Sequence, residues 1–175
     1  YKPFARVIHW TMAVLILATI PVGQLMVMPG WPRAVGDAMF IFHKNVGVLL
    51  LILLVIRAVY RLANPPLPLP ASVPPWQRRA AGLTHFGLYV MIAVMAVSGY
   101  VRVKAGGFPL ESLDALGVPS LVPRSDALGD AASGVHFYAR LVLILLILMH
   151  VGAAAFHGLV KRDGVFGRMW PRNGD

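Results

Sequence analysis

Cysteine is absent from this 175-residue sequence, and charged residues are scarce. Without cysteine the chain can form no disulfide, no Cys-ligated zinc site, no iron–sulfur cluster and no covalently attached c-type haem. Charged residues make up 13% of the chain and hydrophobic residues 58%, whereas charged residues account for about 25% of a typical soluble domain. This composition indicates a protein whose solvent is a lipid bilayer.

Acidic residues are the scarcer charged class, with seven Asp and Glu against sixteen Lys and Arg and a formal net charge of +9. In a soluble protein such an excess of cations would suggest a nucleic-acid partner. Here the cations stand mostly at the ends of apolar segments, so membrane topology accounts for them and no nucleic acid is expected. No cleavable signal peptide is expected at the start of the printed sequence.

Four long apolar segments dominate the sequence, at residues 4–28, 37–62, 76–103 and 127–160. Each exceeds the about 20 residues that a helix needs to cross a bilayer, and each is apolar on most of its faces. We therefore predict an all-α integral membrane protein, a single domain over residues 1–175 in which four transmembrane helices form a bundle. The longest connection, KAGGFPLESLDALGVPSLVPRSDALGD, leaves room for a short helix.

The cations divide unevenly between the two ends of such a bundle. One end would carry Lys2, Arg6, Arg57, Arg61, Arg78, Arg79, Lys161, Arg162, Arg168 and Arg172. The other end would carry Arg33, Lys44, Arg102, Lys104, Arg124 and Arg140. The positive-inside rule places the richer end in the cytoplasm, so both termini are expected there.

Six histidines lie in or at the edge of the predicted spans, namely His9, His43, His85, His136, His150 and His157. A histidine at membrane depth is costly unless it is paired or bound to a metal, so each is a functional candidate. Zinc or copper sites would need ligands clustered at one height, often with cysteine or carboxylate. A proton relay would use Asp or Glu at mid-membrane, and the sequence has none there.

The fourth span carries a stripe of three histidines. His136 and His150 are fourteen residues apart, which places them on nearly one helix face and ~21 Å apart in height. His157 follows seven residues later, on the same face and ~10 Å lower. His136 is therefore expected near the outer surface, and the other two toward the inner surface.

The other spans supply partners at each level. His43 lies early in the second span, which starts outside, and so matches His136. His9 and His85 lie early in spans that start inside, and both match the lower histidines of the fourth span. Imidazoles that face one another in pairs at two heights predict two stacked b haems. Ligation by two imidazoles leaves no open iron position, which suits electron transfer.

Two arginines within the spans lie near these levels. Arg57 follows His43 by fourteen residues, which places it on the same face at the inner level. Arg140 lies one turn below His136. Because a buried guanidinium needs an anion and the middle of the spans contains no acid, we predict that Arg57 and Arg140 pair with haem propionates.

Four stretches carry a resemblance to a known family: IHW at residues 8–10, FHKNVGVLLLILLVIRAVYRL at 42–62, GLTHFGLYV at 82–90 and HFYARLVLILLILMHVGAAAFHGLV at 136–160. Together they resemble the bacterial diheme cytochrome b-561 family, and the likeness covers essentially the whole chain. The best-defined members of that family are superoxide oxidases, also called superoxide:ubiquinone oxidoreductases. The architecture is also similar to the cytochrome b subunits of nickel–iron hydrogenases and formate dehydrogenases.

The resemblance implies a set of iron ligands, namely His43 with His136 in the outer haem and His9 with His150 in the inner haem. His85 and His157 are then left beside the inner haem, where a quinone docks in such proteins. An imidazole can donate a hydrogen bond to a quinone carbonyl and move a proton during its reduction.

The resemblance also implies a function, in the bacterial inner membrane. Electrons would pass from a periplasmic-side donor, with superoxide expected, through the two haems to ubiquinone near the cytoplasmic side. Cations on the outer face would attract the superoxide anion, although acidic residues share that face. The alternative is a membrane anchor subunit that links quinone to a separate dehydrogenase or soluble cytochrome.

Overall fold

The computed structural model describes residues 2–170, and within them the chain forms helices and no strands. The long helices are α1 (Pro3–Leu25), α2 (Arg33–Ala63), α3 (Pro75–Ala105) and α5 (Asp126–Ala155). The shorter elements are α4 (Glu111–Ala115), the π-helical turn η1 (Phe156–Lys161) and the 3-10 turn η2 (Phe166–Arg168). The four predicted spans and the short helix in the longest connection are therefore confirmed. Tyr1 and Arg172 lie outside the described residues.

The ends of the long helices follow from local sequence. α1 and α3 begin with proline at a first helical position, where the missing N–H costs nothing. α5 begins after Ser125, whose side chain accepts a hydrogen bond from the Leu128 N–H at 3.3 Å. α2 ends before Asn64, which precedes Pro65 and has φ −133° and ψ 75°, because a residue before proline avoids the helical region.

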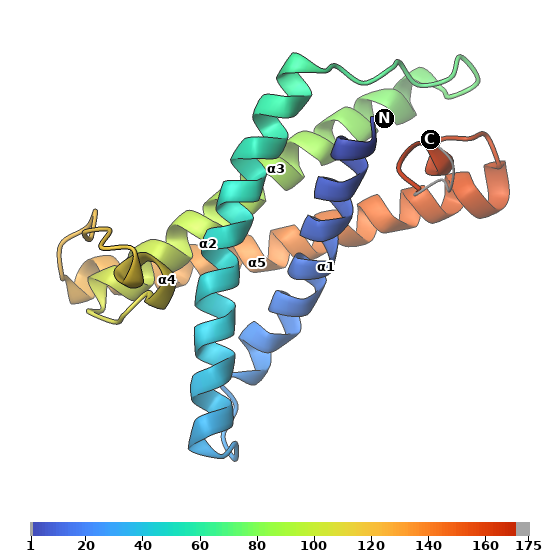
Figure 1. Ribbon diagram of the computed structural model, residues 1–175. Helices are drawn as coiled ribbons and strands as arrows, with labels where there is room; N and C mark the ends of the chain where they lie inside the picture. The colour runs from blue at the N-terminus through green and yellow to red at the C-terminus, as the bar shows by residue number, and fades with distance from the viewer. Residues whose placement is uncertain (1, 171–175) are drawn as a thin grey trace.

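The helices are arranged as two hairpins that cross (Figure 1). α1 packs along α2, α3 packs along α5, and α2 joins the hairpins by packing on α3. The core between α1 and α2 consists of five buried residues, Ile8, Met12, Val46, Leu50 and Leu54. Within the described residues, neither α1 nor α2 packs extensively along the backbone of α5. The space between the hairpins is thus bounded by side chains from both.

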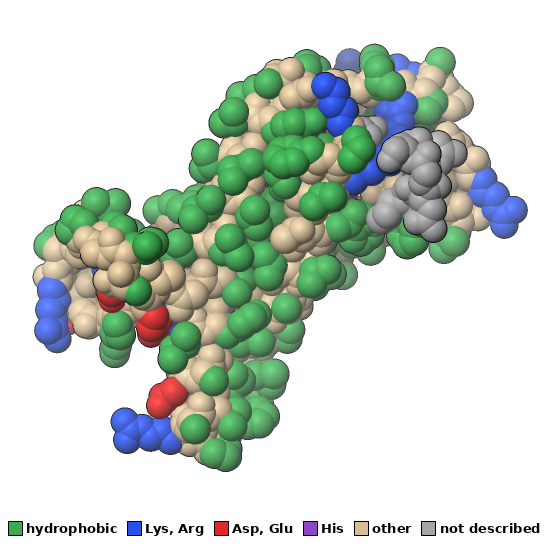
Figure 2. Space-filling view, in the orientation of Figure 1, with side chains coloured by type: hydrophobic (Ala, Val, Ile, Leu, Met, Phe, Trp, Pro, Cys, Tyr) green, Lys and Arg blue, Asp and Glu red, His purple; other side chains and the backbone are tan. Residues whose placement is uncertain are grey.

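The outer faces of the helices are apolar. All four long helices are long and apolar enough to cross a membrane. Figure 2 shows hydrophobic side chains over the middle of the molecule and Lys and Arg side chains toward its extremities. Exposed apolar side chains of this kind include Val14, Leu17, Ile52, Val55, Leu145 and Leu148. A continuous apolar surface of this extent is the surface that lipid covers in a membrane protein.

Contacts between distant segments show which ends of the helices lie together. The Nζ of Lys2 donates to Oδ1 of Asn64 at 2.7 Å, and Arg168 donates to the carbonyls of Leu67 and Pro68 at 2.9 and 2.8 Å. The start of α1, the α2–α3 connection and the C-terminal segment therefore share one end, here called the inner end (Figure 1). The opposite end, with α4 and the start of α2, is called the outer end.

Candidate haem-binding sites

His43 of α2 and His136 of α5 face each other near the outer end. Their ring centroids lie 6.3 Å apart and their planes are inclined by 73°. A metal–imidazole bond is about 2 Å long and the nitrogen is about 1 Å from the ring centroid, so two imidazoles on opposite sides of one iron have centroids about 6 Å apart. The observed separation fits an iron between the two rings.

The hydrogen bonds of His43 leave its other ring nitrogen free for a metal. Its Nδ1 lies 3.0 Å from the carbonyl oxygen of Thr19 and 3.2 Å from the hydroxyl of the same residue. Because a carbonyl oxygen only accepts, Nδ1 carries the proton and Nε2 has the lone pair. Metal-binding histidines typically donate their second N–H in this way. Sequence reasoning did not identify Thr19, because a lone threonine in an apolar helix has no distinguishing pattern.

Two glycines let the outer imidazoles approach neighbouring backbones. A Cβ on Gly23 of α1 would lie 2.5 Å from Cε1 of His43, closer than real Cβ contacts. A Cβ on Gly99 of α3 would lie 3.3 Å from Cε1 of His136. Sequence reasoning missed both residues, and the available signal was a glycine interrupting an apolar span.

A cavity of ≈ 670 Å³ opens between α2, α3 and α5 at this level, and both outer histidines line it. Its volume is in the range of cofactor sites, about 300–1,000 Å³. Gly47 lines it with open space where a side chain would stand. With two imidazoles about 6 Å apart, a free Nε2 and an adjoining space of this size, the residues fit a haem.

Neither of the two arginines assigned to haem propionates has an acidic partner among residues 2–170. Arg140 donates to Oε1 of Gln24 at 2.8 Å and its guanidinium lies 5.0 Å from the ring centroid of Phe137. The arginine that lines the outer cavity is Arg102, which the sequence had placed only among the outer cations. Arg57 donates to the carbonyl of Ala5 at 3.2 Å at the inner level.

Three histidines from three helices meet toward the inner end. The ring centroids of His9 and His150 are 6.1 Å apart, with planes inclined by 74°. His85 is closer to His150, at 5.3 Å and 67°. The separation for two imidazoles on one iron, about 6 Å, favours His9 over His85 as the partner of His150. His85 then stands beside the pair as a third imidazole.

His157 lies in a different setting from the other histidines. Regular α-helix ends at Ala155, and the π-helical turn from Phe156 to Lys161 carries His157, so the regular 3.6-residue spacing from His150 does not extend to it. Its Nδ1 lies 2.6 Å from Oδ2 of Asp163, and the two side chains are only 13% and 16% exposed. Among the described contacts, its ring meets Phe156 and not His85. The two residues assigned to quinone are therefore not in direct contact.

Asp163 is held in the ionised form. Burial alone would raise its pKa, but the hydrogen bonds from His157 and from the backbone N–H of Val165 outweigh that effect and keep the pKa below its usual value. Arg162, between this acid and the π-helical turn, has a left-handed backbone with φ 50°. Strained residues of this kind often occur at functional sites.

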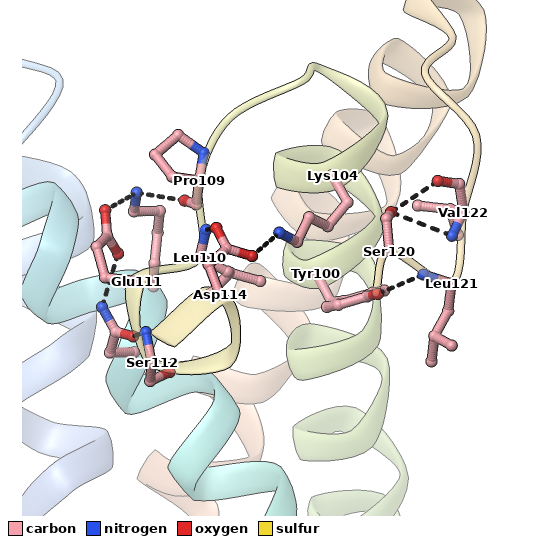
Figure 3. A network of polar contacts seen from close by, with 12 residues as sticks. Tyr100, Lys104, Pro109, Leu110, Glu111, Ser112, Asp114, Ser120, Leu121 and Val122 are labelled. Atoms are coloured by element: carbon pink, nitrogen blue, oxygen red, sulfur yellow. Dashed lines mark hydrogen bonds and ion pairs between the residues drawn. The ribbon is translucent and has the colours of Figure 1, made fainter. Parts of the chain in front are cut away.

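The short helix α4 lies beside the outer cavity and is tied to two of the long helices (Figure 3). Glu111 accepts from Nζ of Lys44 at 2.6 Å and from Nδ2 of Asn45 at 2.8 Å. Lys104 of α3 forms an ion pair with Asp114. Leu110 and Glu111 line the cavity, so the segment forms part of its wall and is called the cover below.

These contacts shift the pKa values of both acids of α4. For Glu111 burial would raise the pKa, but the hydrogen bonds from Lys44 and Asn45 lower it below its usual value. For Asp114 the hydrogen bond from Lys104 is the main cause of a lowered pKa. Both carboxyl groups are therefore ionised at neutral pH, as an ion-paired cover requires.

Comparison with known proteins indicates the family of this chain. The family described as prokaryotic cytochrome b561 matches residues 1–172. The chain is 30% identical to cytochrome b561 homolog 2 of Escherichia coli (strain K12) over 174 residues, covering 97% of this chain and 90% of that protein. It is 26% identical to cytochrome b561 homolog 1 of the same organism over 172 residues, covering 94% and 93% respectively. The chain therefore belongs to the prokaryotic cytochrome b561 family, and it is a membrane electron-transfer protein of the b-haem type.

Proposed function

We propose that this cytochrome carries electrons across the membrane through two b haems. His43 and His136 would hold the outer haem, and His9 and His150 the inner haem. The observation that carries the proposal is the pair of imidazole separations, 6.3 and 6.1 Å. The two sites share α5, where fourteen residues between His136 and His150 correspond to ~21 Å of helix.

When bound, the haems would supply one-electron chemistry. The four histidines would hold them, two for each haem, and two imidazoles for each haem would favour electron transfer over the binding of dioxygen. Arg57 at the inner level and Arg102 at the outer cavity are placed to attract propionates. Arg140 would bind a propionate only after its hydrogen bond to Gln24 is broken.

At the outer end, superoxide is the proposed electron donor, and its oxidation yields dioxygen. Lys44 and Arg102 line the cavity and would attract a small anion. Asp37 and Glu111 line it as well, and Glu111 is already paired with Lys44.

At the inner end, ubiquinone is the proposed acceptor, near His85 and His157. Reduction to quinol needs two electrons and two protons. A doubly protonated His157 could donate its Nε2 proton to the quinone while its Nδ1–H stays hydrogen-bonded to Asp163. The inner end carries the richer set of cations, which supports a cytoplasmic location for both termini in the bacterial inner membrane.

The first test is the haem content of the purified protein. We expect a low-spin b-type spectrum and two haems per chain, as bis-imidazole ligation requires. His43→Ala or His136→Ala should remove the outer haem and leave the inner one. Loss of both haems from either variant would contradict the separate pairs, and a preparation that binds no added haemin would refute the proposal.

The second test concerns the donor and the acceptor. Superoxide mixed with the oxidised protein in a stopped-flow instrument should reduce the haems, and ubiquinone in the membrane should reoxidise them. If superoxide leaves the haems oxidised while quinol reduces them, the protein is a membrane anchor subunit that serves a separate dehydrogenase or soluble cytochrome. The haem assignment survives that outcome.

A further inference from the structure

Among the residues that the structure describes, Ser98 is the one buried polar residue, with 6% of its surface exposed. It lies on α3, one residue before Gly99, where the ring of His136 comes close to the backbone. Its Oγ is 3.1 Å from Nδ1 of His136 and 3.2 Å from the carbonyl oxygen of Met95. A hydroxyl has one proton to donate, and the two contacts compete for it.

The two contacts can be assigned from the chemistry of the partners. The carbonyl of Met95 has no proton, so this contact is a hydrogen bond only if the hydroxyl of Ser98 donates to it. The Oγ of Ser98 can then only accept from His136, which means that Nδ1 of His136 carries the proton. The lone pair of His136 therefore sits on Nε2, the nitrogen that remains for a metal.

We infer that Ser98 is a positioning residue for the outer haem, which fixes the tautomer and orientation of His136 and lowers the reduction potential of that haem. The inference rests on the proposed ligation of the outer haem by His136. An acceptor on Nδ1–H makes the imidazole a stronger base. A more basic ligand stabilises ferric iron more than ferrous iron, and so opposes reduction.

His43 provides the internal comparison, because its Nδ1 is held by a backbone carbonyl. Thr19→Ala would remove the hydroxyl at 3.2 Å but keep the carbonyl at 3.0 Å. Ser98→Ala would remove the hydroxyl that accepts from His136 and leave only the backbone carbonyl of Met95 as an acceptor beside the ring. Ser98→Thr retains a hydroxyl. The three variants therefore separate the loss of the acceptor from a general disturbance of the packing.

The test is a redox titration of the purified haem-loaded protein. Ser98→Ala should raise the reduction potential of the outer haem by up to about 59 mV, which corresponds to a change of about tenfold in the ratio of ferrous to ferric haem for one electron. Thr19→Ala should shift the same potential less, and Ser98→Thr should restore the value of the unaltered protein. Loss of the outer haem from Ser98→Ala but not from Ser98→Thr also supports the positioning role. An unchanged potential in Ser98→Ala, or an equal shift in Thr19→Ala, overturns the inference.

A second measurement needs no variant of Ser98. In the unaltered ferric protein, proton NMR should resolve the Nδ1–H of His136 as a signal that exchanges slowly with deuterated water, because a buried hydroxyl holds it. A signal that exchanges at once overturns the inference. His136→Ala tests the proposed haem ligands separately from the role of Ser98. If that variant keeps the outer haem, His136 is not a ligand of that haem, whatever the results for the Ser98 variants.

Discussion

Replacing Glu111 by alanine should release α4 from the end of α2. Both carboxylate oxygens of Glu111 are engaged, with Lys44 at 2.6 Å and Asn45 at 2.8 Å. Exposed ion pairs contribute about 0.2–1 kcal/mol, and hydrogen bonds to charged groups about 1.5–3 kcal/mol. The side chains of Lys44 and Glu111 are 12% and 35% exposed, which places the loss between these ranges, at about 1–2 kcal/mol.

Amide hydrogen exchange over residues 110–115 measures this loss directly. A change of one or two kcal/mol alters a local equilibrium about 5–30-fold, so exchange in α4 should accelerate by that factor. Glu111→Gln, which removes the charge and keeps the shape, should have a smaller effect. The control is Asp37→Ala at the same end, since Asp37 pairs with Arg33 at 3.7 Å with side chains 65% and 96% exposed. Unaltered exchange in Glu111→Ala, or equal acceleration in Asp37→Ala, would refute the reasoning.

Three further predictions concern the cover and the two ends of the bundle. The first concerns pH, because Glu111 and Asp114 have lowered pKa values. Their contribution to the stability of α4 is fully present above the ordinary carboxyl pKa of about 4 and is lost as the pH falls through the lower pKa of the folded state. Amide exchange in α4 that is equally slow in acid would contradict this. Gly23→Ala should displace His43 and lower the content of outer haem. Gly36→Ala should leave the haem content unchanged, because its new Cβ meets nothing within 4 Å. Pyridine haemochrome analysis measures the haem content of both variants. Asp163→Asn should slow quinone reduction at least about tenfold and alter its pH profile while both haems stay bound, and a variant that loses a haem would argue for a role in haem binding.

The four long helices and the level of the outer histidine pair could be predicted from the sequence. Hydrophobic length alone determines where a helix can cross a membrane. Helical spacing then places His136 and His150 at different heights, and the direction of each span determines that His43 belongs with His136. The inner level was ambiguous from spacing, because His9 and His85 both begin spans at that end, and their separations from His150 now favour His9.

The immediate surroundings of the histidines could not be predicted. Thr19, Gly23 and Ser98 touch histidines on other helices, and such contacts depend on how the helices rotate and cross. Periodicity describes one helix at a time and contains no information about crossing angles. The π-helical turn around His157 was missed for a related reason, since the turn carries a Gly but no Pro to signal a change of helix type. Its pairing with Asp163 follows from that local change.

The division of the outer site between the two hairpins has a consequence for biogenesis. The α1–α2 hairpin contains His43 together with the Thr19 and Gly23 contacts that orient it, and the α3–α5 hairpin contains His136 with Ser98 and Gly99. Each hairpin can therefore finish its half of the site as it leaves the ribosome and inserts into the membrane, before the other half is present. Incorporation of haem would then be the step that locks two preassembled halves together.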